Sequence, residues 1–229
     1  MSARGTVALI GGGEWTAACR PVDERLLAVA GGREVVVLTA AAAFEHPDRV
    51  SARAADWFAE LGAKVSDLGV LTRRDAENDE HVRTLRAASF IYIADGSPLH
   101  LRSVLKGSAL YDAMIHAYEG GAVLAASGAG ATVLCDPMVD PRGGAFTVGL
   151  GLVSGVAVFP YHGSTAEHLR ERSVDLLAPG AVLLGIDEHT AVVRSGNGKW
   201  EVVGPGAVTL YKKGAKPKSF KNGKTVELA

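Results

Sequence analysis

The sequence has few of the residues that mark several classes of protein. It contains two cysteines, Cys19 and Cys135, which lie far apart and in no Cys-x-x-Cys or Cys/His spacing. We therefore expect neither a disulfide framework nor a zinc site, and we expect the protein to reside in a reducing compartment. No apolar run reaches the length of a membrane span without a glycine or a charge, and the run at residues 6–10 is too short for a signal-peptide core. We therefore expect a cytoplasmic protein with no membrane partner.

An excess of charge of one sign is also missing. The 24 Lys and Arg residues nearly cancel the 25 Asp and Glu residues, so no overall field attracts nucleic acid. The one basic stretch, residues 211–224, carries six lysines among Gly and Pro. This pattern favours a solvated edge hairpin, whose lysines prevent pairing with another chain, over a nucleic-acid surface.

Apolar residues make up 48% of the chain, enough for a sizeable core. Through the first two thirds, short apolar runs alternate with amphipathic segments. Such alternation is typical of a parallel sheet covered by helices on both faces. The expected strands are residues 6–10, 34–40, 64–68, 90–94 and 122–126, and the expected helices are residues 22–30, 48–61, 79–87 and 99–118.

The last third has a different pattern. After a strand at residues 156–160 and a helix at 165–177, short alternating runs are separated by turns, and Ser195-Gly-Asn-Gly-Lys199 is a strong hairpin signal. We interpret these runs as an antiparallel extension of the same sheet. The sequence thus predicts a single domain over residues 1–229, a three-layer α/β/α fold with a mainly parallel central sheet and a C-terminal antiparallel extension.

In such a sheet, ligands bind beyond the carboxyl ends of the strands, so the segments that follow the strands are the candidates for a site. The first of these, Gly11-Gly-Gly-Glu-Trp15, looks like a phosphate loop, but a dinucleotide fingerprint would need glycine at Thr16. Residues 222–225, Asn-Gly-Lys-Thr, imitate the end of a Walker motif, but the glycine required earlier is Lys218. No nucleotide or other cofactor is therefore expected.

The segment after residue 126 is more informative. It reads Ser127-Gly-Ala-Gly-Ala131, and a strand followed by small residues and a helix is the geometry of a nucleophile elbow. The same pattern also fits a plain glycine-rich turn. Two later residues favour chemistry, because His162 and Glu188 each follow an expected strand and would supply a general base and its orienting carboxylate.

Together these segments resemble the dipeptidase E and cyanophycinase family of serine peptidases. The resemblance rests on the first strand ending in Ile-Gly-Gly-Gly-Glu, on residues 90–114, on the elbow, on residues 149–158 before His162, and on Gly-Ile-Asp-Glu-His-Thr-Ala-Val-Val at 185–193. It implies a fold akin to class I glutamine amidotransferases, within the flavodoxin-like architecture. It also implies hydrolysis of small peptides or related amides.

The resemblance places a residue without a hydroxyl at the nucleophile. The family elbow reads Gly-Thr/Ser-Ser-Ala-Gly-Ala, so its Ala-Gly-Ala aligns with residues 129–131 and its serine with Gly128. Ser127 lies one residue earlier, where a strand side chain points to the opposite face. We therefore expect Ser127 to point away from the missing hydroxyl.

Some family features are retained. The resemblance makes His162 the base, with His168 a weaker candidate, and Glu188 the acid. The N–H groups of Gly96 and Ala129 would form the oxyanion hole.

Other family features are replaced. Asp95, Ser97 and Pro98 replace Gly, Asp and Gln of the family loop, and Pro160 and Tyr161 replace Asp and Gln before His162. Cyanophycin is therefore a poor expectation for the substrate. Asp95, Ser97 and Tyr161 become candidate substrate-binding residues.

Two functions remain open at this point. One is a small-peptide or amide hydrolase whose activity is weak or lost because Gly128 stands at the nucleophile position; the other is a non-catalytic member that binds a peptide or other small ligand in the same cleft. Arg142 and Asp140, in a turn-rich segment after the elbow, are candidates for bordering that cleft.

Neither a metal nor a fixed assembly is indicated by a motif. Asp136, Asp140 and His162 match no metal-ligand spacing, so no metal is expected. Members of the family differ in assembly, and a homodimer is our expectation here.

Overall fold

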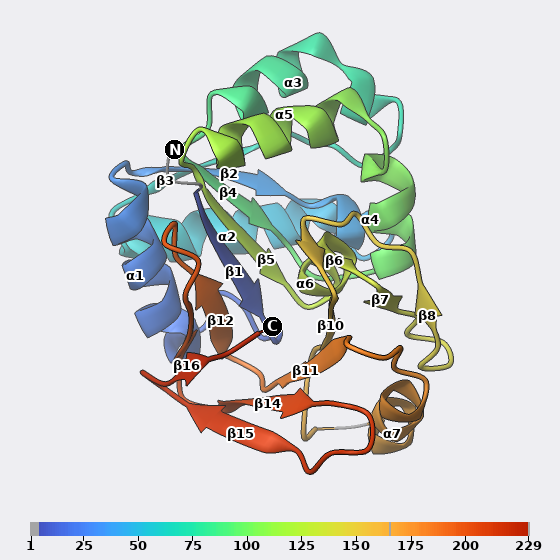
Figure 1. Cartoon of the computed structure of the whole chain (residues 1–229). Helices are drawn as coiled ribbons and strands as arrows, with labels where there is room; N and C mark the ends of the chain where they lie inside the picture. Colours follow the sequence, from blue (N-terminus) through green and yellow to red (C-terminus); the bar gives the residue numbers. More distant parts are fainter. Residues whose placement is uncertain (1–4, 165, 229) are drawn as a thin grey trace.

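The computed structural model describes residues 5–164 and 166–228 (Figure 1). Within them, eight strands form the larger sheet in the order β16-β13-β12-β1-β5-β4-β2-β3. Strands β1, β5, β4, β2 and β3 run parallel, and β12, β13 and β16 are added antiparallel beside β1. The bounds are β1 Thr6–Ile10, β2 Glu34–Leu38, β3 Lys64–Asp67, β4 Phe90–Ile93, β5 Val123–Ser127, β12 Ala191–Arg194, β13 Trp200–Val203 and β16 Thr225–Val226.

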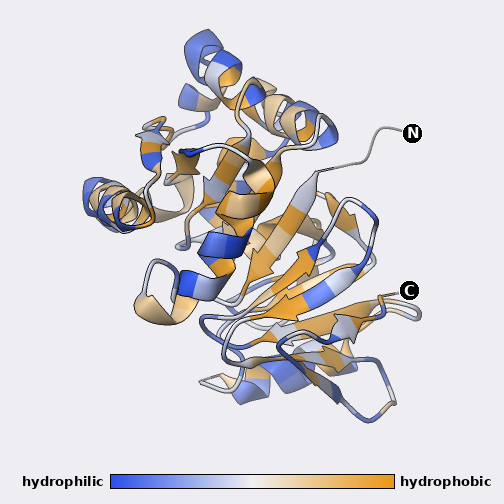
Figure 2. Ribbon diagram, turned by 90° about the vertical axis from the view of Figure 1, so that its left-hand side faces the viewer, coloured by the Kyte–Doolittle hydropathy of each residue, from blue (hydrophilic) through white to orange (hydrophobic). Residues whose placement is uncertain are grey.

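Helices cover both faces of this sheet, as the continuous apolar strands predict. Alternate residues of each strand enter different apolar clusters: Ala8 and Tyr92 pack with α1 and α2, whereas Leu9 and Ile93 pack with α3 to α6. Figure 2 shows the apolar colour concentrated in the strands and the polar colour on the outer sides of the helices. The helices are α1 Arg20–Ala30, α2 Pro47–Glu60, α3 Asp79–Arg86, α4 Pro98–Leu105, α5 Ala109–Glu119 and α6 Ala129–Leu134, with short 3-10 turns at Ala17–Cys19, Ala40–Ala42 and Asp75–Glu77.

A second sheet lies at the other side of α6, and it corrects part of the prediction. The expected antiparallel extension is present as β12, β13 and β16, but other strands that follow α6 in the chain pair with one another in the order β15-β14-β11-β10-β6-β9. The alternation of apolar residues identifies a strand without identifying its neighbour, so the sequence could not separate the two sheets. The bounds are β6 Cys135–Asp136, β9 Val153–Ser154, β10 Val156–Phe159, β11 Val182–Ile186, β14 Ala207–Tyr211 and β15 Lys218–Lys221, with a small pair β7 Met138–Val139 and β8 Phe146–Thr147.

The single helix expected over residues 99–118 is two helices, α4 and α5. The chain leaves the helical conformation at Lys106, whose ψ is 116°, and Gly107 follows with a φ of 65°, in the left-handed region that glycine adopts without strain. Ser108 then caps α5 by accepting a hydrogen bond from the N–H of Tyr111. A glycine followed by a serine is an ordinary stop and start signal, which the apolar periodicity concealed.

Helix α7 spans Glu167–Asp175, within the expected 165–177, and Thr165 lies outside the described residues. In the described part of the chain, no helix is long and apolar enough to cross a membrane. The parallel strands β1, β4 and β5 end on the same side of the larger sheet, and the loops that follow them meet beside the loop after β10 (Figure 1). This meeting point holds the candidate site.

Candidate active site

Gly128 forms the sharp turn between β5 and α6. Its φ is 49° and its ψ is −106°, a conformation that side-chain-bearing residues adopt at a cost, and its N–H donates to the carbonyl of Ile10 at 3.0 Å. A strained residue between a strand and a helix is the geometry of a nucleophile elbow. The backbone at Gly128 therefore has the shape of an elbow, while the residue itself has no nucleophilic atom.

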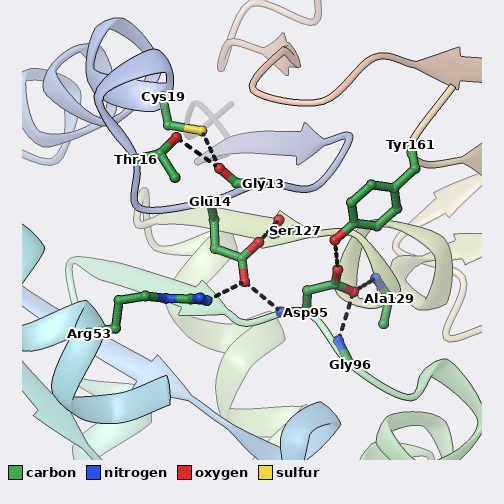
Figure 3. A network of polar contacts seen from close by, with 10 residues as sticks. All are labelled: Gly13, Glu14, Thr16, Cys19, Arg53, Asp95, Gly96, Ser127, Ala129 and Tyr161. Atoms are coloured by element: carbon green, nitrogen blue, oxygen red, sulfur yellow. Dashed lines mark hydrogen bonds and ion pairs between the residues drawn. The ribbon is translucent and has the colours of Figure 1, made fainter. Parts of the chain in front are cut away.

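Ser127 points away from this turn. Its side chain is fully buried, and its hydroxyl donates to Oε2 of Glu14 at 2.7 Å (Figure 3). Glu14 is itself buried; its Oε1 accepts from the N–H of Asp95 at 3.2 Å and lies 3.6 Å from Nη2 of Arg53. Ser127 is thus part of a buried polar network beneath the elbow, in which its hydroxyl holds a carboxylate.

Asp95 occupies the place that an oxyanion hole would offer to a substrate. Its Oδ1 accepts hydrogen bonds from the N–H of Gly96 at 2.7 Å and from the N–H of Ala129 at 2.6 Å (Figure 3). These are the two N–H groups that the resemblance assigns to an oxyanion. A carboxylate oxygen held by two backbone N–H groups is a stable arrangement, because hydrogen bonds to a charged acceptor are among the stronger ones.

The same carboxyl group fills the space above Gly128. A Cβ atom built on Gly128 would lie well under 3.0 Å from Oδ1 and Cγ of Asp95, closer than real Cβ atoms come to a non-bonded neighbour. A side chain at position 128 and the observed position of Asp95 are therefore mutually exclusive. The glycine and the aspartate fit together as a pair.

Tyr161 holds the other oxygen of Asp95. Its hydroxyl donates to Oδ2, and its ring lies against Gly12, where a Cβ atom would overlap the ring at less than 3.0 Å. Burial raises the pKa of Tyr161, and the negative charge of Asp95 raises it further. The phenol therefore stays protonated and acts as a hydrogen-bond donor.

His162 is engaged at both ring nitrogens. Nδ1 lies 2.8 Å from Oδ1 of Asp187, and Nε2 lies 2.7 Å from the hydroxyl of Tyr211. A carboxylate can only accept, so Nδ1 carries the proton and, in the neutral ring, Nε2 accepts from the phenol. The histidine and carboxylate have the contact of a catalytic pair, but the nitrogen that would face a nucleophile is bound to Tyr211.

Glu188, the expected partner of His162, does not make this contact. Its side chain is exposed, and the neighbouring Asp187 contacts the ring instead. The reason is the alternation of β11: Gly185 faces the His162 ring so closely that a Cβ atom would come within 3.0 Å of it, and Asp187, two residues on, points to the same side. Glu188 lies on the opposite side, and His168 is an exposed residue of α7.

The remaining candidates have local partners. Ser97 caps α4 by accepting from the N–H of His100 at 3.3 Å. Arg142 is exposed and pairs with Asp140 through Nε at 2.9 Å and Nη2 at 2.6 Å. This pairing lowers the pKa of Asp140 to about 2. Of the two, Asp140 borders the cavity described next, and Arg142 does not.

A cavity of about 290 Å³ lies beside Asp95. Gly96, Ala129 and Tyr161 contribute to its wall, so it adjoins the three groups that bind the Asp95 carboxylate. Its other walls are largely apolar and include Val139, Phe159, Pro160, Ala166 and Leu169. Within the described residues, no group of three or more His, Cys, Asp or Glu side chains is arranged to hold a metal ion.

Three residues of the candidate site were not predicted from the sequence. Glu14 lies in the glycine-rich segment that we considered as a phosphate loop and as part of the family resemblance, without a role for its carboxylate, and Asp187 adjoins the expected acid. The alternation along the strand could have singled out Asp187. Tyr211 could not have been found, because it comes from β14, which the sequence did not place beside His162.

Comparisons with known proteins agree with this architecture. Residues 7–202 match the model of peptidase family S51. The cyanophycinase of Synechococcus elongatus is 28% identical over 223 residues, covering 90% of this chain and 68% of its own. The cyanophycinase of Nostoc sp. strain PCC 7120 is 28% identical over 215 residues, covering 89% of this chain and 72% of its own.

Two solved structures are similar over nearly the whole chain. A peptidase from an acI-B1 Actinobacterium has a TM-score of 0.88 at 28% identity, covering 98% of this chain and 97% of its own. A putative peptidase E protein from Listeria monocytogenes EGD-e has a TM-score of 0.65 at 15% identity, covering 96% and 99%, and supports the fold alone. With the family model matching most of its length, the chain belongs to peptidase family S51.

Proposed function

We propose that this S51 member has lost serine-type peptidase chemistry and binds a small ligand in the cavity beside Asp95. The observation that carries the proposal is the position of the Asp95 carboxylate. It accepts from the N–H groups of Gly96 and Ala129, which a serine peptidase of this fold would direct at the oxyanion of the substrate. An internal anion therefore competes with the transition state for the same donors.

The two residues at the elbow, Gly128 and Ser127, support the same interpretation. Gly128 supplies no hydroxyl at the elbow, and the hydroxyl of Ser127 is buried against Glu14. Removing the nucleophile from such a constellation leaves a residual rate that depends on the oxyanion hole and binding, about 10³ to 10⁴ over water. Here that residual is expected to fall further, because the hole is already filled.

A weak hydrolase of small peptides or amides is the second candidate. The contact between His162 and Asp187 favours it, since a histidine oriented by a carboxylate can activate a water molecule as well as a serine. For this to operate, the ring must exchange its contact with Tyr211 for the water.

The two candidates are separated by labelling and by turnover. The purified protein is treated with a fluorophosphonate probe and assayed on a dipeptide panel that includes Asp-Xaa substrates, beside a His162→Ala variant. We expect no labelling and no hydrolysis above that variant. Stoichiometric labelling that disappears in Ser127→Ala, or turnover that disappears in His162→Ala, would establish a hydrolase instead.

A further inference from the structure

The cavity beside Asp95 has an unusual combination of walls and charge. Among the described residues that line it, the charged side chains are Asp95 and Asp140, both acidic. The remaining surface comes mainly from apolar side chains such as Val139, Phe159 and Leu169. A cavity with apolar walls and charge of one sign selects a ligand by charge as well as by shape.

The two acidic residues are not equivalent. Asp140 has a counter-ion, because the guanidinium of Arg142 binds both of its oxygens. The hydrogen-bond donors on the Asp95 side chain are neutral groups: two backbone N–H groups and the phenol of Tyr161. Asp95 therefore brings a negative charge to the cavity without a cation beside it in the described part of the chain.

Asp95 also has room for one more partner. An ionised carboxylate has about four acceptor sites, two on each oxygen. Oδ1 uses both of its sites for Gly96 and Ala129, and Oδ2 uses one for Tyr161. Asp95 lines the cavity, and a donor bound there would complete the remaining site on Oδ2.

We infer that the ligand is a small organic amine, with its ammonium group on Asp95 and its apolar body against Val139, Phe159 and Leu169. This inference rests on the proposed binding function and names the ligand class of the same site. A volume of about 290 Å³ is at the small end of ligand cavities, which suits a single ring or a short branched chain. A ligand that carries a carboxylate in the same place is repelled by Asp95.

Three probes of similar size and different charge test the inference: 2-phenylethylamine, 2-phenylethanol and phenylacetate. Their affinities for the whole protein are measured by isothermal titration calorimetry, with variants Asp95→Asn and Asp140→Asn. We expect the amine to bind at least tenfold more tightly than the alcohol and phenylacetate to bind most weakly. Asp95→Asn should weaken the amine at least tenfold and change the alcohol less than twofold. Asp140→Asn should weaken the amine no more than threefold, because Asp140 holds Arg142 rather than the ligand in the proposed complex, and the exposed Arg142 cation that it leaves is screened by solvent.

The outcomes keep this inference distinct from the proposed function. The Asp95→Asn substitution keeps the size of the side chain and an acceptor for the two N–H groups, and unchanged alcohol binding shows that the variant retains its cavity. If the alcohol or phenylacetate binds as tightly as the amine, if the amine does not bind, or if Asp95→Asn leaves amine binding unchanged, the ligand class is wrong. Probe labelling or dipeptide hydrolysis would instead overturn the proposed function.

Discussion

The pairing of Gly128 with Asp95 gives the most specific prediction of the structure. If the carboxyl group of Asp95 fills the space above Gly128, then Gly128→Ser must displace it. The substitution also places a side chain at a φ of 49° and a ψ of −106°. We therefore expect Gly128→Ser to destabilise the protein through two separate costs.

The two costs have comparable size. Backbone strain at a sparsely populated conformation costs about 1–3 kcal/mol. Expelling Asp95 breaks three hydrogen bonds to its carboxylate, but the displaced group regains water, so we take the cost of about one such bond, roughly 1–3 kcal/mol. The sum is about 2–6 kcal/mol, which for a protein of this length lowers the melting temperature by roughly 4–24 °C.

A double-mutant cycle with Asp95→Gly isolates the second cost. The free energy of unfolding is measured by urea denaturation for the wild type, each single variant and the double variant. In Gly128→Ser the Asp95 carboxylate has already left its position, so Asp95→Gly should cost about 1–3 kcal/mol less in that background than in the wild type. Gly31→Ser is the control, because Gly31 has a φ of 67° and no atom near its hypothetical Cβ. It should show a cost of strain without coupling to Asp95.

Additivity would refute this reasoning. If the two substitutions add to within about 0.5 kcal/mol, Asp95 and position 128 do not compete for space. A Gly128→Ser protein as stable as Gly31→Ser would lead to the same conclusion. In either case the position of Asp95 would lose its support as the reason for the proposed loss of peptidase chemistry.

Two further predictions concern the buried polar groups near the site. Ser127→Ala should destabilise the protein by about 1–3 kcal/mol in urea unfolding, because Oε2 of Glu14 is buried and loses its donor. Asp23→Asn should flatten the dependence of stability on pH: burial raises the pKa of Asp23 to about 7 from 3.8, despite the hydrogen bond from Trp57. Its contribution to stability is therefore full below about pH 3.8 and is lost as the pH rises to about 7, as urea unfolding between these values measures.

Each of these variants has a control of the same chemistry. Ser103→Ala removes an exposed serine of α4, and Asp56→Asn removes an exposed carboxyl group of α2. Both should stay within about 0.5 kcal/mol of the wild type. Equal losses in Ser127→Ala and Ser103→Ala would contradict the role of Ser127, and parallel pH curves for the wild type and Asp23→Asn would contradict that of Asp23.

Much of the larger sheet could be predicted from the sequence, since the parallel strands β1, β2, β4 and β5 are mainly apolar runs bounded by glycine or polar residues. The strand expected at residues 6–10 is β1, and the helix expected at residues 48–61 is α2, which begins and ends one residue earlier. The second sheet could not be predicted. The pairing of β10 with β11 and of β11 with β14 depends on contacts between distant segments, which a local pattern does not encode.

The candidate site divides in the same way. The elbow follows from small residues at the end of a strand, a local feature of the sequence. The family resemblance, which rests on such local motifs, is what assigned the N–H groups of Gly96 and Ala129 to an oxyanion hole. The contact of Tyr161 with Asp95 joins residues 66 positions apart, and that of Tyr211 with His162 joins residues 49 apart. No periodicity in the sequence relates these pairs.

The sequence by itself determined the family, the three-layer arrangement and the absence of a hydroxyl at Gly128, because each of these depends on residue types within short segments of the chain. Only the tertiary structure decided what stands in place of that hydroxyl. The Asp95 carboxylate lies above Gly128 because three donors from separate segments, the N–H groups of Gly96 and Ala129 and the phenol of Tyr161, meet there once the strands have paired. Gly128 leaves room for a carboxylate because it has no side chain, and the pairing of the strands places the Asp95 carboxylate there.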